Sequence, residues 1–314
     1  MDDDKLQLID LWRTSFDDSE EFINLFFDRV YRKENVLFIK ENGRIVSALQ
    51  MLPYVMTYYG TEISVSYIYA ACTLPAERGK GLMRRLIQEA FDVMEKRKVA
   101  LTVIIPAGPR LFDYYRKAGY TEAFDYSEEI YVRPHETTWE RGMLVVPPEV
   151  PSMETLYRYF DKKQRERTCY VLHGFDDFVT LLRDLQQSGG QMLTALDENE
   201  KPAGMIFFLP ADDHICVKEM MYDDNHVKNL LLQEATTQNK VEKAVCRIPF
   251  SGLSTVPFGM ARVLDRDRLI RHWSTTHENS ALNIEELKKM DTPSLTRLLL
   301  DYPAREAYMS LMLD

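Results

Sequence analysis

Residues 75–84 read Pro75-Ala76-Glu77-Arg78-Gly79-Lys80-Gly81-Leu82-Met83-Arg84, and this stretch separates a strand pattern from a helix pattern. Before it, apolar and other residues alternate from residue 63 to residue 71, which is the period of a strand. After it, apolar residues recur at helical spacing from residue 82 to residue 94. A glycine turn between a strand and a helix lets backbone N–H groups at the helix start converge on an anion. We therefore predict a pyrophosphate cradle here, to which the basic side chains of the stretch add positive charge.

The glycine turn fits neither of two common phosphate-binding motifs. A P-loop has Ser or Thr after Gly-Lys, whereas Gly81 follows Lys80. A dinucleotide fingerprint of the form G-x-G-x-x-G fails because its last position is Arg84.

The patterns around the glycine turn predict a mixed domain of helices and strands. An Asn-Gly hairpin turn falls at residues 42–43. The expected helices are 6–12, 20–31, 82–94 and 111–117, and the expected strands are 36–39, 45–51, 55–59, 63–71, 101–105 and 128–132.

A proline-rich stretch at 142–154 predicts a linker, and the elements beyond it repeat the earlier order. The expected helices there are 152–164, 176–187 and 226–239, and the expected strands are 191–196, 203–209, 215–221 and 244–248. A strand at 258–264 and helices at 267–273 and 293–300 follow. We interpret the repeat as a distant structural duplication, and we predict three domains: 1–140, 141–252 and 253–314.

Composition narrows the function classes. The chain has 314 residues and a formal net charge of -10, which argues against a general nucleic-acid binder. Four cysteines without a C-x-x-C pair, no apolar run of membrane-spanning length and an acidic start predict a reduced, cytoplasmic protein without membrane contact. The charge is uneven: residues 2–28 hold nine acids and two bases, whereas residues 78–98 hold seven bases and three acids. Six histidines form no metal-ligand spacing, so we expect no metal.

The segment Arg78-x-x-Gly81-x-Met83, with strand 63–74 before it, resembles motif A of the GCN5-related N-acetyltransferases (GNAT). In that family the motif begins with Arg or Gln, has Gly at its fourth position and ends with Gly or Ala at its sixth. The family uses this motif to bind the pyrophosphate of acetyl-CoA. Met83 departs from this pattern. Because of this departure and its second GNAT-like half, the chain resembles the Eis-type (enhanced intracellular survival) branch. The resemblance implies an α+β fold. It would consist of tandem GNAT-like domains, each a mixed, mostly antiparallel sheet flanked by helices, and a small, abbreviated sterol-carrier-like C-terminal domain.

The resemblance also implies the cofactor residues. Those expected to bind acetyl-CoA are Ala71, Cys72, Thr73, Arg78, Gly79, Lys80, Gly81, Leu82, Met83 and Arg84. The backbone of the first three would line the acetyl and pantetheine part, and its N–H groups could polarise the thioester carbonyl. Cys72 could in principle be a nucleophile, but the family transfers acetyl groups directly, which favours a small strand residue there.

Two residues are predicted to move protons. The segment from Asp113 to Tyr120 resembles the part of the family that packs beside the CoA sulfur, and its general-acid tyrosine falls on Tyr115, whereas Tyr114 and Tyr120 are expected in the core. In Eis-type proteins the base is a C-terminal carboxylate, which here would be Asp314.

The predicted reaction is direct transfer of an acetyl group to a primary amine of a small cationic molecule or a lysine. The alternative is a CoA-binding regulatory or scaffold protein without catalysis. Acidic residues of the N-terminal helices, such as Asp17, Asp18, Glu20 and Glu21, could attract a cationic amine, but a solvated helix start is the favoured explanation. Residues 220–227 of the second half lack glycine and carry two aspartates, so we expect only the first half to bind acetyl-CoA. The resemblance further implies a homo-oligomer.

Overall fold

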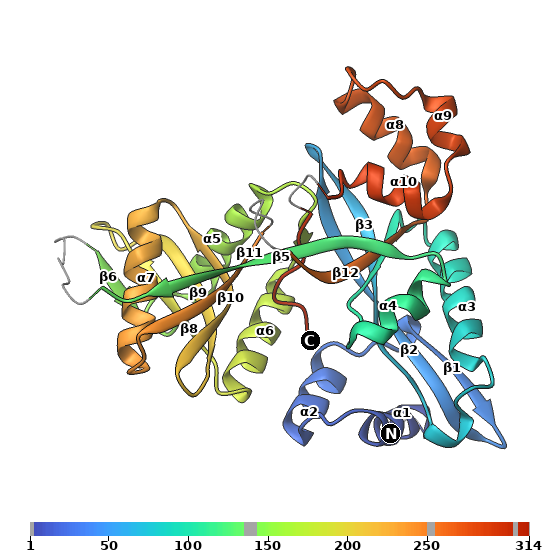
Figure 1. Ribbon diagram of the computed structural model, residues 1–314. Coiled ribbons are helices and arrows are strands. Elements are labelled where there is room, and N and C mark those ends of the chain that lie inside the picture. The colour runs from blue at the N-terminus through green and yellow to red at the C-terminus, as the bar shows by residue number, and fades with distance from the viewer. Residues whose placement is uncertain (1–2, 135–142, 250–254, 304–306, 314) are drawn as a thin grey trace. The chain divides into compact units, whose positions relative to one another are not determined.

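The computed structural model describes residues 3–134, 143–249, 255–303 and 307–313, which fall into two compact units (Figure 1). Unit 1 is Met1–Phe124 with Pro257–Ala307, and unit 2 is Asp125–Val256 with Tyr308–Asp314. These units are defined by spatial contacts, so the division into domains 1–140, 141–252 and 253–314 stays a prediction. Within the described ranges, no helix combines the length and apolar character that a bilayer crossing needs.

Unit 1 is a mostly antiparallel sheet with helices packed against it, which confirms the predicted fold class. Its strand order is β1-β2-β3-β4-β12-β5. The strands are β1 (Val36–Glu41), β2 (Arg44–Tyr58), β3 (Thr61–Thr73), β4 (Leu101–Ile104), β5 (Thr121–Val132), which continues into unit 2, and β12 (Thr255–Val263). The helices are α1 (Asp3–Ser15), α2 (Glu20–Arg29), α3 (Leu82–Lys96), α4 (Pro109–Arg116), α8 (Arg266–Thr276), α9 (Ile284–Lys289) and α10 (Thr292–Leu299).

Strand β2 is one long strand where the sequence predicts two. The gap between the predicted strands 45–51 and 55–59 holds Pro53, and proline cannot donate to a strand ladder. In the structure Pro53 pairs with Ser66 of β3, while β1 pairs only with residues up to Gln50. Pro53 therefore lies beyond the end of β1 and interrupts no pairing with that strand.

The pairing of strands β3 and β4 ends just before the predicted cofactor residues of β3. They pair in parallel from Val65–Leu101 to Ile68–Ile104, where β4 ends. A bulge follows at once in β3, where Ala70 has a φ of 47°. Residues 71–73 therefore have no β4 partner, and a wedge opens between the two strands.

The stretch 257–307 clusters with the first 124 residues rather than standing alone. Strand β12 lies between β4 and β5 and pairs antiparallel with β4 from Met260–Ile104 to Val263–Leu101. The predicted helix start at Thr292-Pro293 is confirmed, since the Asp291 side chain accepts a 2.9 Å hydrogen bond from the Ser294 N–H. The sterol-carrier-like character of this stretch stays a prediction.

Unit 2 has its core on both faces of mostly antiparallel strands in the order β5-β11-β10-β9-β8-β6. The strands are β6 (Leu144–Val146), β8 (Gln191–Leu196), β9 (Pro202–Pro210), β10 (His214–Tyr222) and β11 (Lys243–Ile248), with a short β7 (Val171–Leu172). The helices are α5 (Met153–Arg165), α6 (Phe175–Gln187) and α7 (Asn225–Gln238).

The second unit repeats the wedge of the first, which supports the predicted duplication. Strands β10 and β11 pair in parallel from His214–Lys243 to Val217–Cys246. A bulge between Val217 and Glu219 follows directly, as it does in β3. The repeat thus extends from the order of elements to the position of an irregularity.

A stability prediction arises at Gly119, which ends the turn after α4. Its φ is 85°, and an added Cβ would lie 2.0 Å from Nη1 of Arg262. That guanidinium lies over the Phe91 ring at 4.5 Å, so its displacement disturbs a packed contact. We expect Gly119→Ala to lower the free energy of unfolding by about 1–3 kcal/mol in urea titration. The control is Gly60→Ala, whose φ of 81° is similar but whose Cβ would meet nothing within 4 Å. If the free energy of unfolding falls equally in the two variants, the Arg262 side chain moves aside without loss of stability.

Candidate active site

The wedge and the glycine turn border one pocket of about 640 Å³ in unit 1. All the predicted cofactor residues except Lys80 line it, and so does Tyr115. The lining side chains that sequence reasoning missed are Ser15, Phe16, Glu77, Leu111 and Tyr114. The structure therefore brings together residues from α1, β3, α3 and α4.

The glycine turn has the backbone that its sequence predicts. Gly79 and Gly81 have φ values of 81° and 78°, a left-handed conformation that costs other residues energy. Gly81 is the N-cap of α3 and has no side chain to accept from the first N–H groups of the helix. Those N–H groups and the positive end of the helix dipole are thus available to an anion at the pocket.

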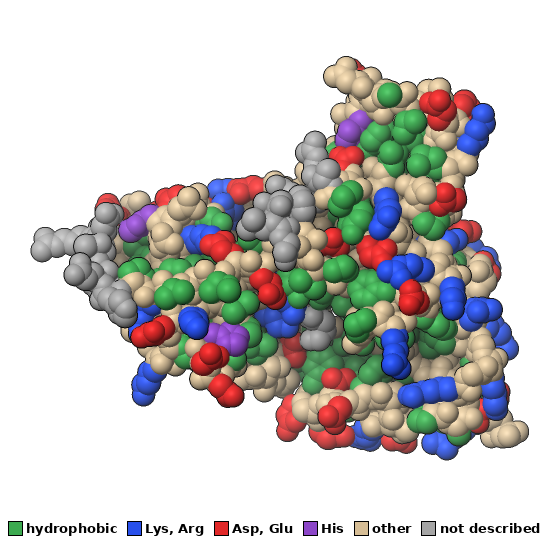
Figure 2. Space-filling view, in the orientation of Figure 1, with side chains coloured by type: hydrophobic (Ala, Val, Ile, Leu, Met, Phe, Trp, Pro, Cys, Tyr) green, Lys and Arg blue, Asp and Glu red, His purple; other side chains and the backbone are tan. Residues whose placement is uncertain are grey.

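The basic side chains of this region divide into two groups. Figure 2 shows Lys and Arg side chains over α3 and α4, and Asp and Glu side chains over α2. Arg78 and Arg84 line the pocket, and Nε of Arg78 donates to the Thr73 carbonyl at 3.1 Å. Lys80 instead pairs with Glu77 and lies 3.8 Å from Glu41. Two arginines of the basic segment are therefore placed to meet a phosphate in the pocket.

The far end of the pocket is the part of β3 that has no β4 partner. The Ser47 hydroxyl donates to the Cys72 carbonyl at 3.1 Å and lies 2.8 Å from the Thr73 hydroxyl, which fixes this segment. Burial raises the pKa of the Cys72 thiol to about 11, so the thiol stays protonated at neutral pH. This state argues against Cys72 as a nucleophile.

Three tyrosines lie near the pocket and differ in their surroundings. Tyr115 is 6% exposed, and burial raises its phenol pKa above the ordinary value, with Tyr114 as a smaller cause. Tyr120 lies in the core and contacts the Thr102 hydroxyl at 3.0 Å. Tyr114, predicted as a core residue, lines the pocket instead. Tyr115 thus carries a phenol that keeps its proton at neutral pH and borders the pocket.

The acids of the α1–α2 turn have structural partners. Asp18 accepts a 2.7 Å hydrogen bond from the Trp12 indole, and Glu20 accepts one from Arg13 at 2.7 Å. Ser19 caps α2 by accepting from the Phe22 N–H at 3.1 Å. These contacts support the structural explanation of the acids, and they fix the turn that carries Ser15 and Phe16 to the pocket.

Two further predictions concern the base and metals. Asp314 lies outside the described residues. In the described ranges, no three His, Cys, Asp or Glu side chains come together as metal ligands would.

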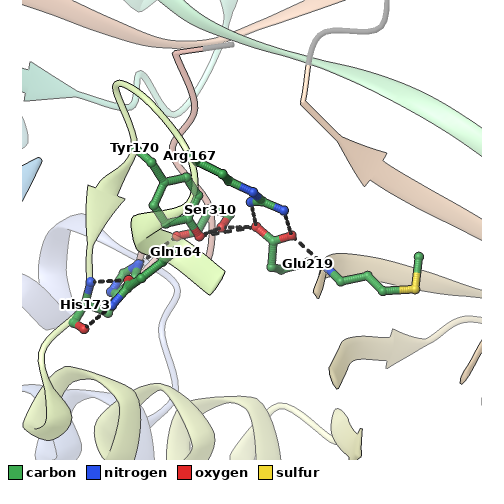
Figure 3. A network of polar contacts seen from close by, with 7 residues as sticks. Gln164, Arg167, Tyr170, His173, Glu219 and Ser310 are labelled. Carbon is green, nitrogen blue, oxygen red and sulfur yellow. Dashed lines mark hydrogen bonds and ion pairs between the residues drawn. The ribbon is translucent and has the colours of Figure 1, made fainter. Parts of the chain in front are cut away.

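The wedge of unit 2 has a different lining. The Glu219 side chain, 1% exposed, follows the bulge of β10, and Arg167 pairs with both of its oxygens at 2.9 and 3.2 Å (Figure 3). Tyr170 donates to Oε2 at 3.3 Å, Ser310 also donates to it, and the Met220 N–H donates to Oε1 at 2.8 Å. A fully hydrogen-bonded carboxylate thus lines the head of this wedge, where a pocket of about 310 Å³ remains.

The helix that follows the unit 2 wedge is also capped. The Asp224 carboxylate accepts from the Val227 N–H at 2.9 Å at the start of α7. The position that is predicted to bind an anion in unit 1 therefore already holds a negative side chain in unit 2, which supports the prediction of a single cofactor site.

Residues 1–123, which form most of unit 1 and carry the glycine-turn pocket, match the family of acetyltransferase (GNAT) domains. No match is found among curated proteins.

The solved structures with a similar fold include the following three. A conserved Enterococcus faecalis V583 protein, described as a probable N-acyltransferase, is 16% identical with a TM-score of 0.71, over 83% of this chain and 70% of that one. A GCN5-related N-acetyltransferase from Anabaena variabilis is 17% identical with a TM-score of 0.70, over 86% and 73%. Eis1 from Mycobacterium abscessus is 11% identical with a TM-score of 0.64, over 85% and 73%. At these identities the likeness concerns the fold.

Proposed function

We propose that the protein is an acetyl-CoA-dependent N-acetyltransferase that moves an acetyl group directly to a primary amine of a small cationic molecule or a lysine. The observation that carries the proposal is the pocket of about 640 Å³ in which the start of α3, the end of β3 beyond its pairing with β4, and Tyr115 meet. The match of residues 1–123 to acetyltransferase domains supports it. Membership of the Eis-type branch, a homo-oligomeric state and a cytoplasmic location are further parts of the proposal.

Each wall of the pocket has its own task in this reaction. Acetyl-CoA supplies the activated acetyl group as a thioester. Arg78, Arg84 and the N–H groups at the start of α3 bind its pyrophosphate. The backbone of residues 71–73 orients the acetyl end and donates to the carbonyl oxygen. Tyr115 donates a proton to the departing sulfur, while Asp314 stays the predicted base.

One observation favours the alternative of a binding protein without catalysis. Glu77 is the one acidic side chain among the described residues that line the pocket, and it pairs with Lys80. A neutral amine needs a group that removes its proton, and a paired glutamate is a poor base. Thiol release from acetyl-CoA, measured against a panel of polyamines, aminoglycosides and lysine peptides, decides between the two. Turnover of any amine supports the enzyme, and CoA binding without turnover across the panel supports the alternative.

We expect Gly81→Ala to weaken acetyl-CoA binding by about tenfold. A Cβ at a φ of 78° costs roughly 1–2 kcal/mol, and relaxing this strain turns the first N–H groups of α3 away from the pocket. Isothermal titration calorimetry measures the change. Gly43→Ala, whose φ is 79° in the β1–β2 turn, is the control and should bind acetyl-CoA as the parent does.

We also expect one acetyl-CoA per chain. In unit 2 the Asp224 carboxylate caps α7 at the place that corresponds to the anion site of unit 1, and the Glu219 carboxylate lines the wedge. Titration to saturation gives the stoichiometry, and a value of two would contradict the single-site assignment.

A further inference from the structure

Unit 2 carries a chain of three polar side chains that the proposed reaction does not use. At the start of β10, Sγ of Cys216 lies 3.3 Å from Nε2 of His214. Nδ1 of the same ring lies 2.8 Å from Oδ1 of Asp213. When Nδ1–H donates to the carboxylate, the Nε2 lone pair faces the thiol and can accept its proton. This order of groups activates a thiol as a nucleophile.

Cys216 lies on the sheet face opposite α7. Its neighbours on β10, Ile215 and Val217, belong to the core beneath that helix, together with Leu231. Because strand side chains alternate between faces, the Cys216 side chain points to the other face.

The neighbouring strands leave that face open to small molecules. In register, Cys216 pairs with Val245 of β11, and Val245 pairs with Ile130 of β5. Ile130 is 68% exposed and Val132, two residues on, is 57% exposed. Lys243 pairs in register with His214 and is exposed, so it adds positive charge beside the three polar side chains.

The other three cysteines provide an internal comparison. Cys169 and Cys246 are 3% and 0% exposed. Burial raises the pKa of the Cys246 thiol to about 12 and that of Cys72 to about 11. Both groups therefore stay protonated and unreactive at neutral pH.

We propose that Cys216 is a modification site that forms a mixed disulfide with low-molecular-weight disulfides carrying carboxylates, with His214 and Asp213 as positioning and proton-accepting residues. The thiol proton passes to Nε2 of His214, and the thiolate attacks one sulfur of the disulfide. A new S–S bond forms as the old one breaks, and the leaving thiolate takes the proton from the imidazolium. Cys216 is oxidised and the reagent disulfide is reduced, since one of its sulfurs leaves as a thiol and the other stays in the mixed disulfide. Lys243 attracts the carboxylates, and Val245 and Ile130 contact the apolar part of the reagent.

The test treats the full chain with oxidised glutathione at neutral pH and follows the adduct by intact mass and peptide mapping. We expect the first glutathione on Cys216, and none at that time in Cys216→Ser. His214→Gln should slow the reaction about threefold or more, because the proton acceptor is lost. The control His226→Gln changes a histidine on α7 and should react as the parent does. Asp213→Asn, at an exposed position, should slow the reaction without affecting folding.

Two results would overturn the proposal. One is a first adduct on Cys72, Cys169 or Cys246. The other is an unchanged rate in both His214→Gln and Asp213→Asn when circular dichroism shows native folding, since the contacts would then serve packing alone.

Discussion

Tyr115→Phe should lower kcat for acetyl transfer by about 100-fold or more while acetyl-CoA binds within a factor of two of the parent. The substitution removes a single hydroxyl from a side chain that is 6% exposed, so packing is retained and the proton donor is lost. Steady-state thiol release gives kcat, and calorimetry gives the dissociation constant.

The matched control is Tyr114→Phe, the neighbouring tyrosine of the same pocket, whose ring centroid lies 5.3 Å from that of Tyr115. Tyr114→Phe should keep kcat within about threefold of the parent. A change of this size can come from a small shift in the orientation of the reacting groups. If kcat falls equally in both variants, the pocket needs its shape rather than the Tyr115 proton. If Tyr115→Phe keeps full turnover, another group protonates the sulfur.

Arg167→Ala should lower the free energy of unfolding by about 3–5 kcal/mol, the largest stability effect expected in unit 2. The substitution leaves the Glu219 carboxylate, 1% exposed, without its cationic partner. The guanidinium also lies 5.0 Å from the centroid of Tyr170 and 5.8 Å from that of Tyr308, so cation–π contacts are lost as well. Urea unfolding measured by fluorescence and circular dichroism gives the change.

Arg165→Ala is the control, because its guanidinium pairs with Asp161 at 2.9 Å on the surface of α5. An exposed pair contributes about 0–1 kcal/mol, so the two losses should differ clearly. The double variant Arg167→Met/Glu219→Gln removes both charges and should recover part of the loss. Equal losses for Arg167→Ala and Arg165→Ala would show that water or another cation compensates Glu219.

The sequence predicts most elements of the fold, and its failures have local causes. Helix α3 and strand β3 carry strong apolar periods, so their predicted and observed ranges agree closely. The sequence predicts two strands where β2 is continuous through Pro53. A proline is tolerated there because β1 ends before it, and the end of β1 depends on tertiary pairing. Helix α9 was missed, since six residues are too few to show a helical period.

The site was predicted where chemistry is local in sequence. The glycine turn and Tyr115 lie in short motifs, and the structure places both on one pocket. Ser15 and Phe16 were missed because only the packing of α1 brings them there. Glu219 was missed as well, since a glutamate in a strand gives no sign that Arg167, 52 positions earlier, will neutralise it.

Strand β12 has a consequence for how the chain matures on the ribosome. It supplies the antiparallel neighbour of β4, a strand whose four residues are all buried, yet it is translated after residues 125–256. Until it emerges, β4 has an unpaired edge, which is prone to pairing with other chains. The pocket, although all of its described lining residues lie before residue 116, therefore belongs to a unit that finishes folding only after the intervening unit has been synthesised.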